Sequence, residues 1–174
     1  MGPLPAALLV VVFAALPLAA RGPMADEQGA GRPLAIIVHR SNPAENVSFA
    51  ELRRIFMLET QTWPHGRKIT VVLREKGQPE RAEAIRIICG LSESEYDKHV
   101  LFQTFRGAVN IGPRSIQSAS LMLRFVYNAP GAIGYVFSDQ VDNTVKLLRI
   151  DGALPGDPGY PLRPVVPREA EDVR

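Results

Sequence analysis

The segment Pro130-Gly131-Ala132-Ile133-Gly134-Tyr135-Val136 decides the fold of this chain. Pro130 cannot continue a helix, and Gly131 is able to adopt the left-handed conformation with which many helices end. The run 132–136 is rich in residues that favour a strand, and Gly134 within it lets another group approach the backbone closely. The segment therefore predicts a helix that stops and is followed at once by a buried strand.

Strand and helix signals alternate along the rest of the chain. Continuous apolar runs predict strands that are buried on both faces. Ser-x-x-Glu capping boxes at Ser48 and Ser92 predict two helix starts, and Pro79 and Gly90 bound a helix between them. The predicted strands cover 34–39, 69–73, 132–137 and 145–150, and the predicted helices cover 48–56, 79–89, 92–105 and 115–128. This alternation predicts an α/β fold with helices packed on a mostly parallel or mixed sheet.

Composition limits the function classes. The chain has 174 residues, enough for one domain, and its formal net charge of +2 does not provide the basic surface that nucleic-acid binding needs. Cys89 is the only cysteine, so no disulfide is expected within the chain, and its place on the apolar side of a helix predicts a buried, inert thiol. The histidines lack metal-ligand spacing, and no nucleophile or phosphate-loop motif occurs. We therefore expect no enzyme, no metal and no cofactor.

The start of the chain has the composition of an export signal. Residues 6–20 form an uncharged apolar run that is followed by small residues, with cleavage expected near Ala20 or Ala25. The predicted organisation is a signal peptide and leader at 1–25, a flexible linker at 26–33, a domain at 34–164 and a disordered tail at 165–174. The expected location is periplasmic or secreted. Because no lysine or arginine precedes the run, an uncleaved anchor or a later start stays open, and translation from Met24 would give a cytoplasmic protein.

Several loops between predicted elements carry groups that suit anion binding. Arginine forks, hydroxyls and helix N-termini hold oxyanions, and open α/β sheets bind ligands where strands meet helices. No single loop is unusual, since loops are polar in general. The candidate ligand-binding residues are Arg40, Ser41, Asn42, Arg74, Gln78, Arg81, Arg114 and Ser115. If they form one site, Arg40, Arg74 and Arg114 should converge on one pocket.

The sequence 130–135, Pro-Gly-Ala-Ile-Gly-Tyr, resembles substrate-binding proteins of phosphate ABC transporters, in which it is the strand that returns through the hinge between two lobes. Other stretches resemble the same family in the same order. They are 38–43 (its outgoing hinge strand), 47–56 (its Leu-Thr-x-x-x-Leu-x-x-Ile-Phe helix), 63–66 (its Trp-x-x-Gly turn), and 146–152 with 159–162 (its closing strand and tail). The resemblance covers about 34–164. It implies one lobe of a type II periplasmic binding protein, with a phosphate-like oxyanion and a membrane transporter as partners.

Two departures from the family separate the hypotheses. Its Arg-x-x-x-Ser-Gly-Thr loop appears as 74–81, where Arg74 is kept, the hydroxyls are lost, and Glu75 and Glu80 would repel an anion. The segment that precedes the hinge strand in two-lobed members has no recognised counterpart before Leu34. One hypothesis is an exported domain that binds phosphate or another small oxyanion. This hypothesis includes a domain that instead meets a second copy or another periplasmic protein through the face that a first lobe would cover. The alternative is a ligand-free periplasmic interaction or sensory accessory module.

Overall fold

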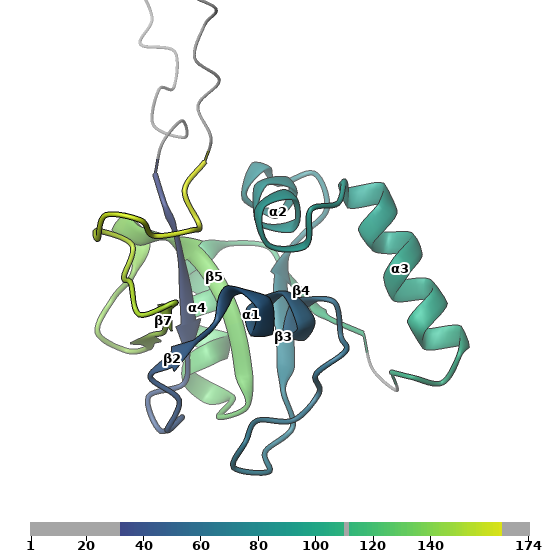
Figure 1. Ribbon diagram of the computed structural model, residues 1–174, viewed down its shortest axis with the longest axis horizontal. Helices are drawn as coiled ribbons and strands as arrows, with labels where there is room; N and C mark the ends of the chain where they lie inside the picture. The colour runs from purple at the N-terminus through teal and green to yellow at the C-terminus, as the bar shows by residue number, and fades with distance from the viewer. Residues whose placement is uncertain (1–31, 110–111, 165–174) are drawn as a thin grey trace, which may run out of the picture.

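The centre of the molecule, in a computed structural model that describes residues 32–109 and 112–164, is a five-stranded mixed sheet of order β4-β3-β5-β1-β6 (Figure 1). Its strands are β1 (Leu34–Val38), β3 (Thr70–Arg74), β4 (Arg114–Ile116), β5 (Ala132–Phe137) and β6 (Lys146–Leu147). β3 runs parallel to both β4 and β5, whereas β1 is antiparallel to β5 and β6. The predicted α/β class and mixed sheet are confirmed.

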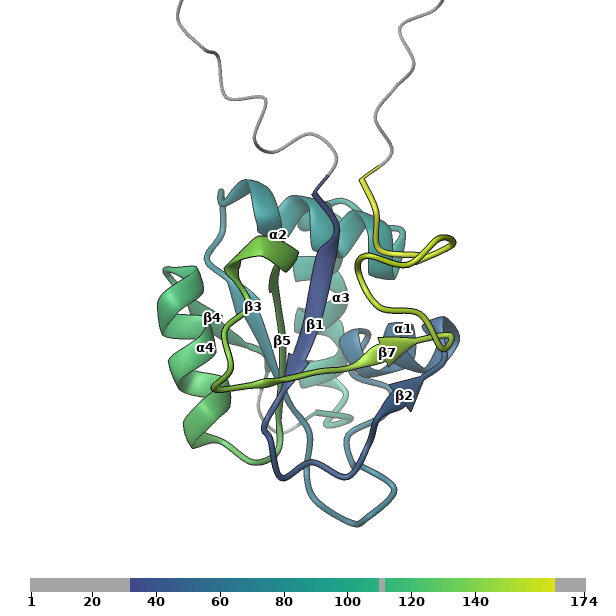
Figure 2. The same cartoon turned by 90° about the vertical axis from the view of Figure 1, so that its left-hand side faces the viewer.

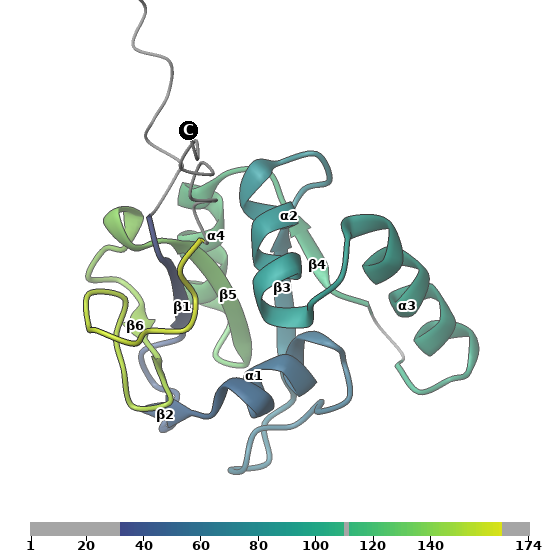
Figure 3. The same ribbon diagram turned by 45° about the horizontal axis from the view of Figure 1, so that its top comes forward.

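Helices cover both faces of this sheet (Figure 2). On one face lie α1 (Phe49–Phe56), α2 (Pro79–Ala84) and the π-helical turn η1 (Ile85–Cys89) that continues α2. On the other face lies α4 (Ala119–Asn128). The helix α3 (Glu93–Phe105) projects away from the sheet (Figure 3). A short 3-10 turn, η2 (Ser138–Gln140), follows β5, and β2 (Asn46–Val47) pairs in parallel with β7 (Arg149–Ile150) beside the main sheet.

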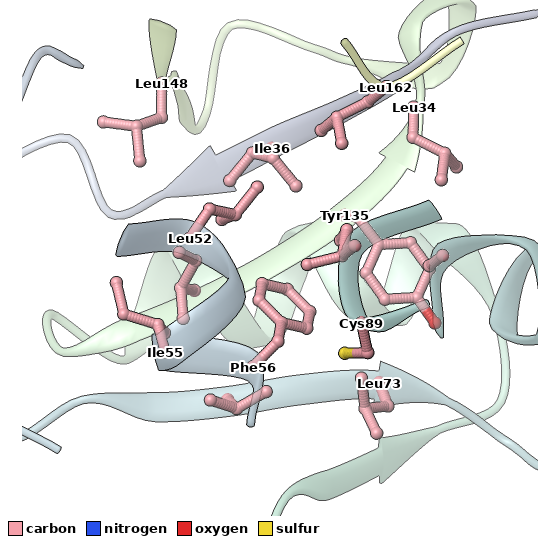
Figure 4. Packing of buried hydrophobic residues seen from close by; sticks show 14 of the residues in the cluster. Leu34, Ile36, Leu52, Ile55, Phe56, Leu73, Cys89, Tyr135, Leu148 and Leu162 are labelled. Atoms are coloured by element: carbon pink, nitrogen blue, oxygen red, sulfur yellow. The ribbon is translucent and has the colours of Figure 1, made fainter. Parts of the chain in front are cut away.

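The core follows from the two-residue period of the strands. In β1, Ile36 packs in the larger hydrophobic cluster with α1 and η1, while Ile37 packs in the smaller cluster with α4. In β5, Tyr135 packs in the larger cluster and Val136 packs in the smaller one. Figure 4 shows the larger cluster, where Phe56 of α1 lies near Tyr135. Every residue of β1 and β5 is buried, as the apolar runs predicted.

Local capping explains where the helices begin and end. Ser92 and Glu95 form a complete capping box at the start of α3, whereas at α1 the Ser48 hydroxyl accepts from the Glu51 N–H without the reciprocal bond. Gly90 ends the α2–η1 helix in the left-handed region, at φ 71°. Ala84, Ile85 and Ile88 form the buried face of this helix, whereas Ala82 is exposed.

Three local predictions were wrong. Residues 115 and 116, expected to begin a helix, belong to the strand β4 that pairs with β3, and the helix starts after Ser118. The strand expected over 145–150 is two short strands, because β6 pairs with β1 and β7 pairs with β2. Gly131 is not left-handed. Its missing side chain instead lets the Lys68 carbonyl approach, since a Cβ there would lie 2.2 Å from that oxygen.

The predicted signal peptide at 1–25, the linker residues 26–31 and the tail at 165–174 lie outside the described residues. The last two linker residues contact the fold. The Arg32 guanidinium pairs with Asp139 and lies 4.4 Å from the centre of the Phe137 ring, and the Pro33 carbonyl accepts from the Ser138 N–H. Within the described ranges, no helix has the length and apolar character required to cross a membrane.

Candidate functional site

The predicted ligand-binding residues lie at two ends of the sheet. Val38 of β1 pairs with Ile133, near the start of β5, and Thr70 at the start of β3 pairs with Ala132. The turn 40–42 that follows β1 therefore lies near the amino end of β3, whereas Arg74 is the last residue of β3. Arg40 and Arg74 do not converge on one pocket.

The residues of the 40–42 turn mainly stabilise the turn itself. Arg40 is exposed. The Ser41 hydroxyl lies 2.8 Å from the Nδ1 atom of His39, and the Asn42 side-chain oxygen accepts from the Ala44 N–H at 2.9 Å. These contacts are those of a turn that redirects the chain after a buried strand.

Arg74 lies at the carboxyl end of β3 with its side chain buried. Its Nη2 atom is 3.7 Å from a carboxylate oxygen of Glu80, and its Nη1 atom donates to the Ile116 carbonyl at 3.5 Å. Both contacts are long. The Nε atom of Arg74 and the second carboxylate oxygen of Glu80 are buried without a hydrogen-bond partner in the described part of the chain. The guanidinium therefore keeps one donor, Nε, that is hidden from water and unused by the fold.

Arg81 is also buried, and carboxylates lie closer to it than Glu80 lies to Arg74, although its Nε atom, like that of Arg74, has no hydrogen bond of good geometry in the described residues. Its Nη1 atom donates to the Arg74 carbonyl at 3.1 Å, its Nη2 atom lies 2.7 Å from the Asp97 carboxylate, and its Nε atom lies 3.0 Å from Glu93. Burial alone would raise the pKa of Asp97, but the hydrogen bond from Lys76 and the charge of Arg81 leave it below its usual value. Arg81, which lies on α2, therefore connects the end of β3 with α3 and contributes to holding these elements together.

The other two candidates near Arg74 are Gln78, which is partly buried, and Ser115, which is exposed. Gln78 precedes α2 and makes no side-chain capping bond, and Ser115 pairs with Leu73 on the exposed edge strand. Arg114, by contrast, pairs with Val72 and lines a separate cavity that includes Lys68 at the amino end of β3. The structure thus brings Arg74, Gln78, Arg81 and Ser115 toward the carboxyl end of β3, away from the 40–42 turn. Arg114, the residue before Ser115, lines the other cavity.

Sequence reasoning missed the groups that complete this end of the sheet. The Glu75 N–H donates to the Ile116 carbonyl at 3.0 Å, which holds the loop after β3 against the end of β4. Ser118 then caps α4, its hydroxyl accepting from the Leu121 N–H at 3.2 Å. A groove of about 450 Å³ runs between these elements, lined in part by Glu75, Ser115 and Gln117. The serine before an apolar helical stripe was the signal that could have identified the helix start.

Charges at this end of the sheet balance internally. The cations Arg74 and Arg81 face the carboxylates of Glu80, Glu93 and Asp97, and the last of these also pairs with Lys76. An anion that approaches Arg74 must therefore compete with Glu80. The arrangement offers oxyanion donors without the surplus positive charge that tight anion binding requires.

Other reactive groups are sequestered in the fold. Cys89 is buried, and burial raises the pKa of its thiol to about 12, as expected for an inert cysteine. Burial also raises the pKa of Tyr135, whose hydroxyl accepts from the Arg74 N–H at 3.1 Å. His99 lies 2.9 Å from the Met57 carbonyl. Across residues 32–109 and 112–164, no three metal-ligating side chains gather into a group.

Comparison with solved structures identifies the fold, although no family model matches the sequence. An ABC-type phosphate transport receptor from Vibrio cholerae matches with a TM-score of 0.59 and 24% identity, over 72% of this chain and 49% of the receptor. PstS from Borrelia burgdorferi matches with a TM-score of 0.60 and 13% identity, over 78% of this chain and 55% of that protein. The chain spans about half the length of these proteins. It therefore has the fold of substrate-binding proteins of phosphate ABC transporters, over the part of that fold that corresponds to a single lobe.

Proposed function

We propose that this chain is an exported, non-enzymatic binding module of a phosphate-type ABC transport system, and that it binds a small oxyanion through Arg74. The observation that carries the proposal is the buried guanidinium of Arg74, whose Nε atom has no partner in the described residues and whose other contacts are 3.5 and 3.7 Å long. It lies at the carboxyl ends of the parallel strands β3 and β4, the place where open α/β sheets bind ligands.

The binding is weak because Glu80 already faces Arg74. Its carboxylate repels an approaching anion, and the hydroxyls that the family's loop would provide are replaced by Gln78 and by Glu80 itself. A phosphate or sulfate ion gains the unused Nε donor of Arg74 but must displace or accommodate a like charge, which weakens its binding. We therefore expect affinity in the millimolar range.

Removal of the Glu80 charge is expected to strengthen oxyanion binding. In calorimetric titrations with phosphate and with sulfate, Glu80→Gln should bind about tenfold more tightly than the wild type, because a like charge beside the anion is removed. Arg74→Ala should abolish binding, and Arg40→Ala is the matched control, since it removes an exposed arginine at the other end of the sheet. The proposal is wrong if neither the wild type nor Glu80→Gln gives heat at millimolar ligand, or if Arg40→Ala weakens binding as much as Arg74→Ala.

A second candidate function is a ligand-free module that pairs with a second copy. It is favoured by the outer half of α3, where Leu101, Phe102 and Phe105 are 57%, 57% and 82% exposed. This helix projects from the sheet (Figure 3), so these side chains are open to a partner. Clustered apolar side chains of this size mark interaction surfaces.

A change of Phe105 to serine tests this candidate. Sedimentation of the wild type should show a dimer at high protein concentration, and Phe105→Ser should shift the chain to monomer, because the most exposed apolar side chain is lost. Tyr127→Ser is the matched control, since Tyr127 is a 52% exposed aromatic residue on α4. A wild type that stays monomeric, or a dimer that both variants leave unchanged, would exclude pairing through α3.

A further inference from the structure

A second cavity lies at the other end of the sheet from Arg74. Its volume is about 300 Å³, within the usual range for small-molecule sites. The segment 58–62 after α1, the start of β3, β4 with the residues just before it, and Phe125 of α4 line its walls. These segments meet because β3 lies between α4 on one face of the sheet and α1 on the other (Figure 2). The cavity is therefore formed by the tertiary fold rather than by one loop.

The lining combines an apolar surface with two cations. Leu58, Val71 and Phe125 supply apolar groups, and Lys68 and Arg114 supply the charges. No aspartate or glutamate lines the cavity, and neither cation forms an ion pair within the described residues. This differs from the Arg74 end, where each buried arginine faces a carboxylate.

Hydroxyl and amide groups complete the polar part of the lining. Thr60, Thr62 and Thr70 line the cavity together with Gln61. The Gln61 side chain donates to the Ala108 carbonyl, which ties the segment after α1 to the segment after α3 and fixes two walls of the cavity relative to each other. Hydroxyls beside a guanidinium and an ammonium can hold the oxygens of a carboxylate.

We propose that this cavity binds a small carboxylate with an apolar body, with Arg114 and Lys68 holding the carboxylate and the apolar wall around Phe125 holding the rest of the ligand. A ligand of the size of benzoate or hexanoate matches both the volume and the mixed lining. A bare inorganic anion would leave the apolar wall unused. Lys68 and Arg114 are both exposed to solvent, so a neutral apolar molecule would gain nothing from their charges. The site is separate from the one at Arg74 and does not depend on it.

Titration with benzoate, followed by the amide signals in two-dimensional NMR, tests this proposal. Benzoate should give saturable shifts at Thr62, Thr70 and Arg114, whereas the neutral analogue benzamide should bind at least tenfold more weakly. Arg114→Gln should weaken benzoate binding about tenfold, because a charge-assisted hydrogen bond is lost. Lys68→Gln should weaken it severalfold. Arg40→Gln is the control, since it removes the same charge from an exposed turn and should leave the affinity unchanged.

The proposal is overturned if no saturable shifts occur up to the solubility limit of benzoate, or if benzoate and benzamide bind equally. It is also overturned if benzoate binding is unaffected in both Arg114→Gln and Lys68→Gln. Shifts confined to the Arg74 end and lost in Arg74→Ala would also overturn it, and would instead support oxyanion binding at that site. Failure of phosphate to bind at Arg74 leaves the benzoate result unaffected, so the two proposals are tested independently.

Discussion

Gly131→Ala is expected to lower the free energy of unfolding by about 2–3 kcal/mol, because a Cβ at this position overpacks a site closed by backbone. The added carbon would lie 2.2 Å from the Lys68 carbonyl oxygen, and no rotamer change can relieve that contact. The carbonyl of Gly131 also accepts from the Thr70 N–H at 3.0 Å and from the Trp63 ring nitrogen at 3.3 Å. Any shift that relieves the clash therefore disturbs the start of both β3 and β5.

Gly134→Ala is the matched control, two residues farther along in β5. Its Cβ would meet the sulfur atom of Met122 at 2.8 Å, and a methionine side chain can move away. We expect a cost below about 1 kcal/mol, since alanine also restricts the unfolded chain more than glycine does. Urea denaturation of both variants measures the difference. If Gly134→Ala proves as costly as Gly131→Ala, the backbone clash is not the cause.

The same segment shows what the sequence could predict. The apolar run after Gly131 predicted a strand buried on both faces, because a strand covered by helices on each side needs no polar residues. Gly134 was expected to admit a close neighbour, and the Met122 side chain is that neighbour. The role of Gly131 was not predictable, since the approach of Lys68 depends on how β3 pairs with β5.

Tertiary pairing also explains why residues 115 and 116 were wrongly predicted to begin a helix. The three residues Arg-Ser-Ile carry no alternating pattern, and Ile116 fits the apolar stripe of the helix that follows. They form a strand only because β3 offers a free edge beside them. A strand this short takes its conformation from its neighbour, so local propensity cannot reveal it.

The sequence predicted which residue types the candidate site contains, but not which side chains contact one another there. Arg74 was identified from the loop pattern, and Glu80 was recognised as an opposing charge. The carboxylate of Asp97 lies 16 residues after Arg81, on a helix whose direction depends on the packing of Tyr96. The loop sequences therefore predicted where the cations occur. The fold decides that two carboxylates lie within 3.0 Å of Arg81, whereas the carboxylate that faces Arg74 is 3.7 Å away.

Arg81→Met is expected to lower the free energy of unfolding by about 3 kcal/mol, because it removes one partner from a buried ion-pair network. The change leaves the Arg74 carbonyl without its side-chain donor and leaves Glu93 and Asp97 without the guanidinium. The cost is at the lower end for such changes, since the side chains of these carboxylates are 21% and 35% exposed and water can reach them. Met is chosen because it fills a similar volume without charge.

Lys76→Met is the matched control for this network. Lys76 pairs with the same Asp97 carboxylate at 2.9 Å, but its side chain is 72% exposed, so its loss should cost less than about 1 kcal/mol. Urea denaturation gives both values, and hydrogen exchange locates the effect. In Arg81→Met the amides of α3 should lose protection before those of the sheet, because the ion pairs of Arg81 with Glu93 and Asp97 on α3 are lost. The polar contacts of α3 that remain include the hydrogen bond from the Tyr96 hydroxyl to the Phe56 carbonyl and the contact of His99 with the Met57 carbonyl. Equal costs for the two variants, or unchanged exchange in α3, would show that Arg81 does not hold this helix to the fold.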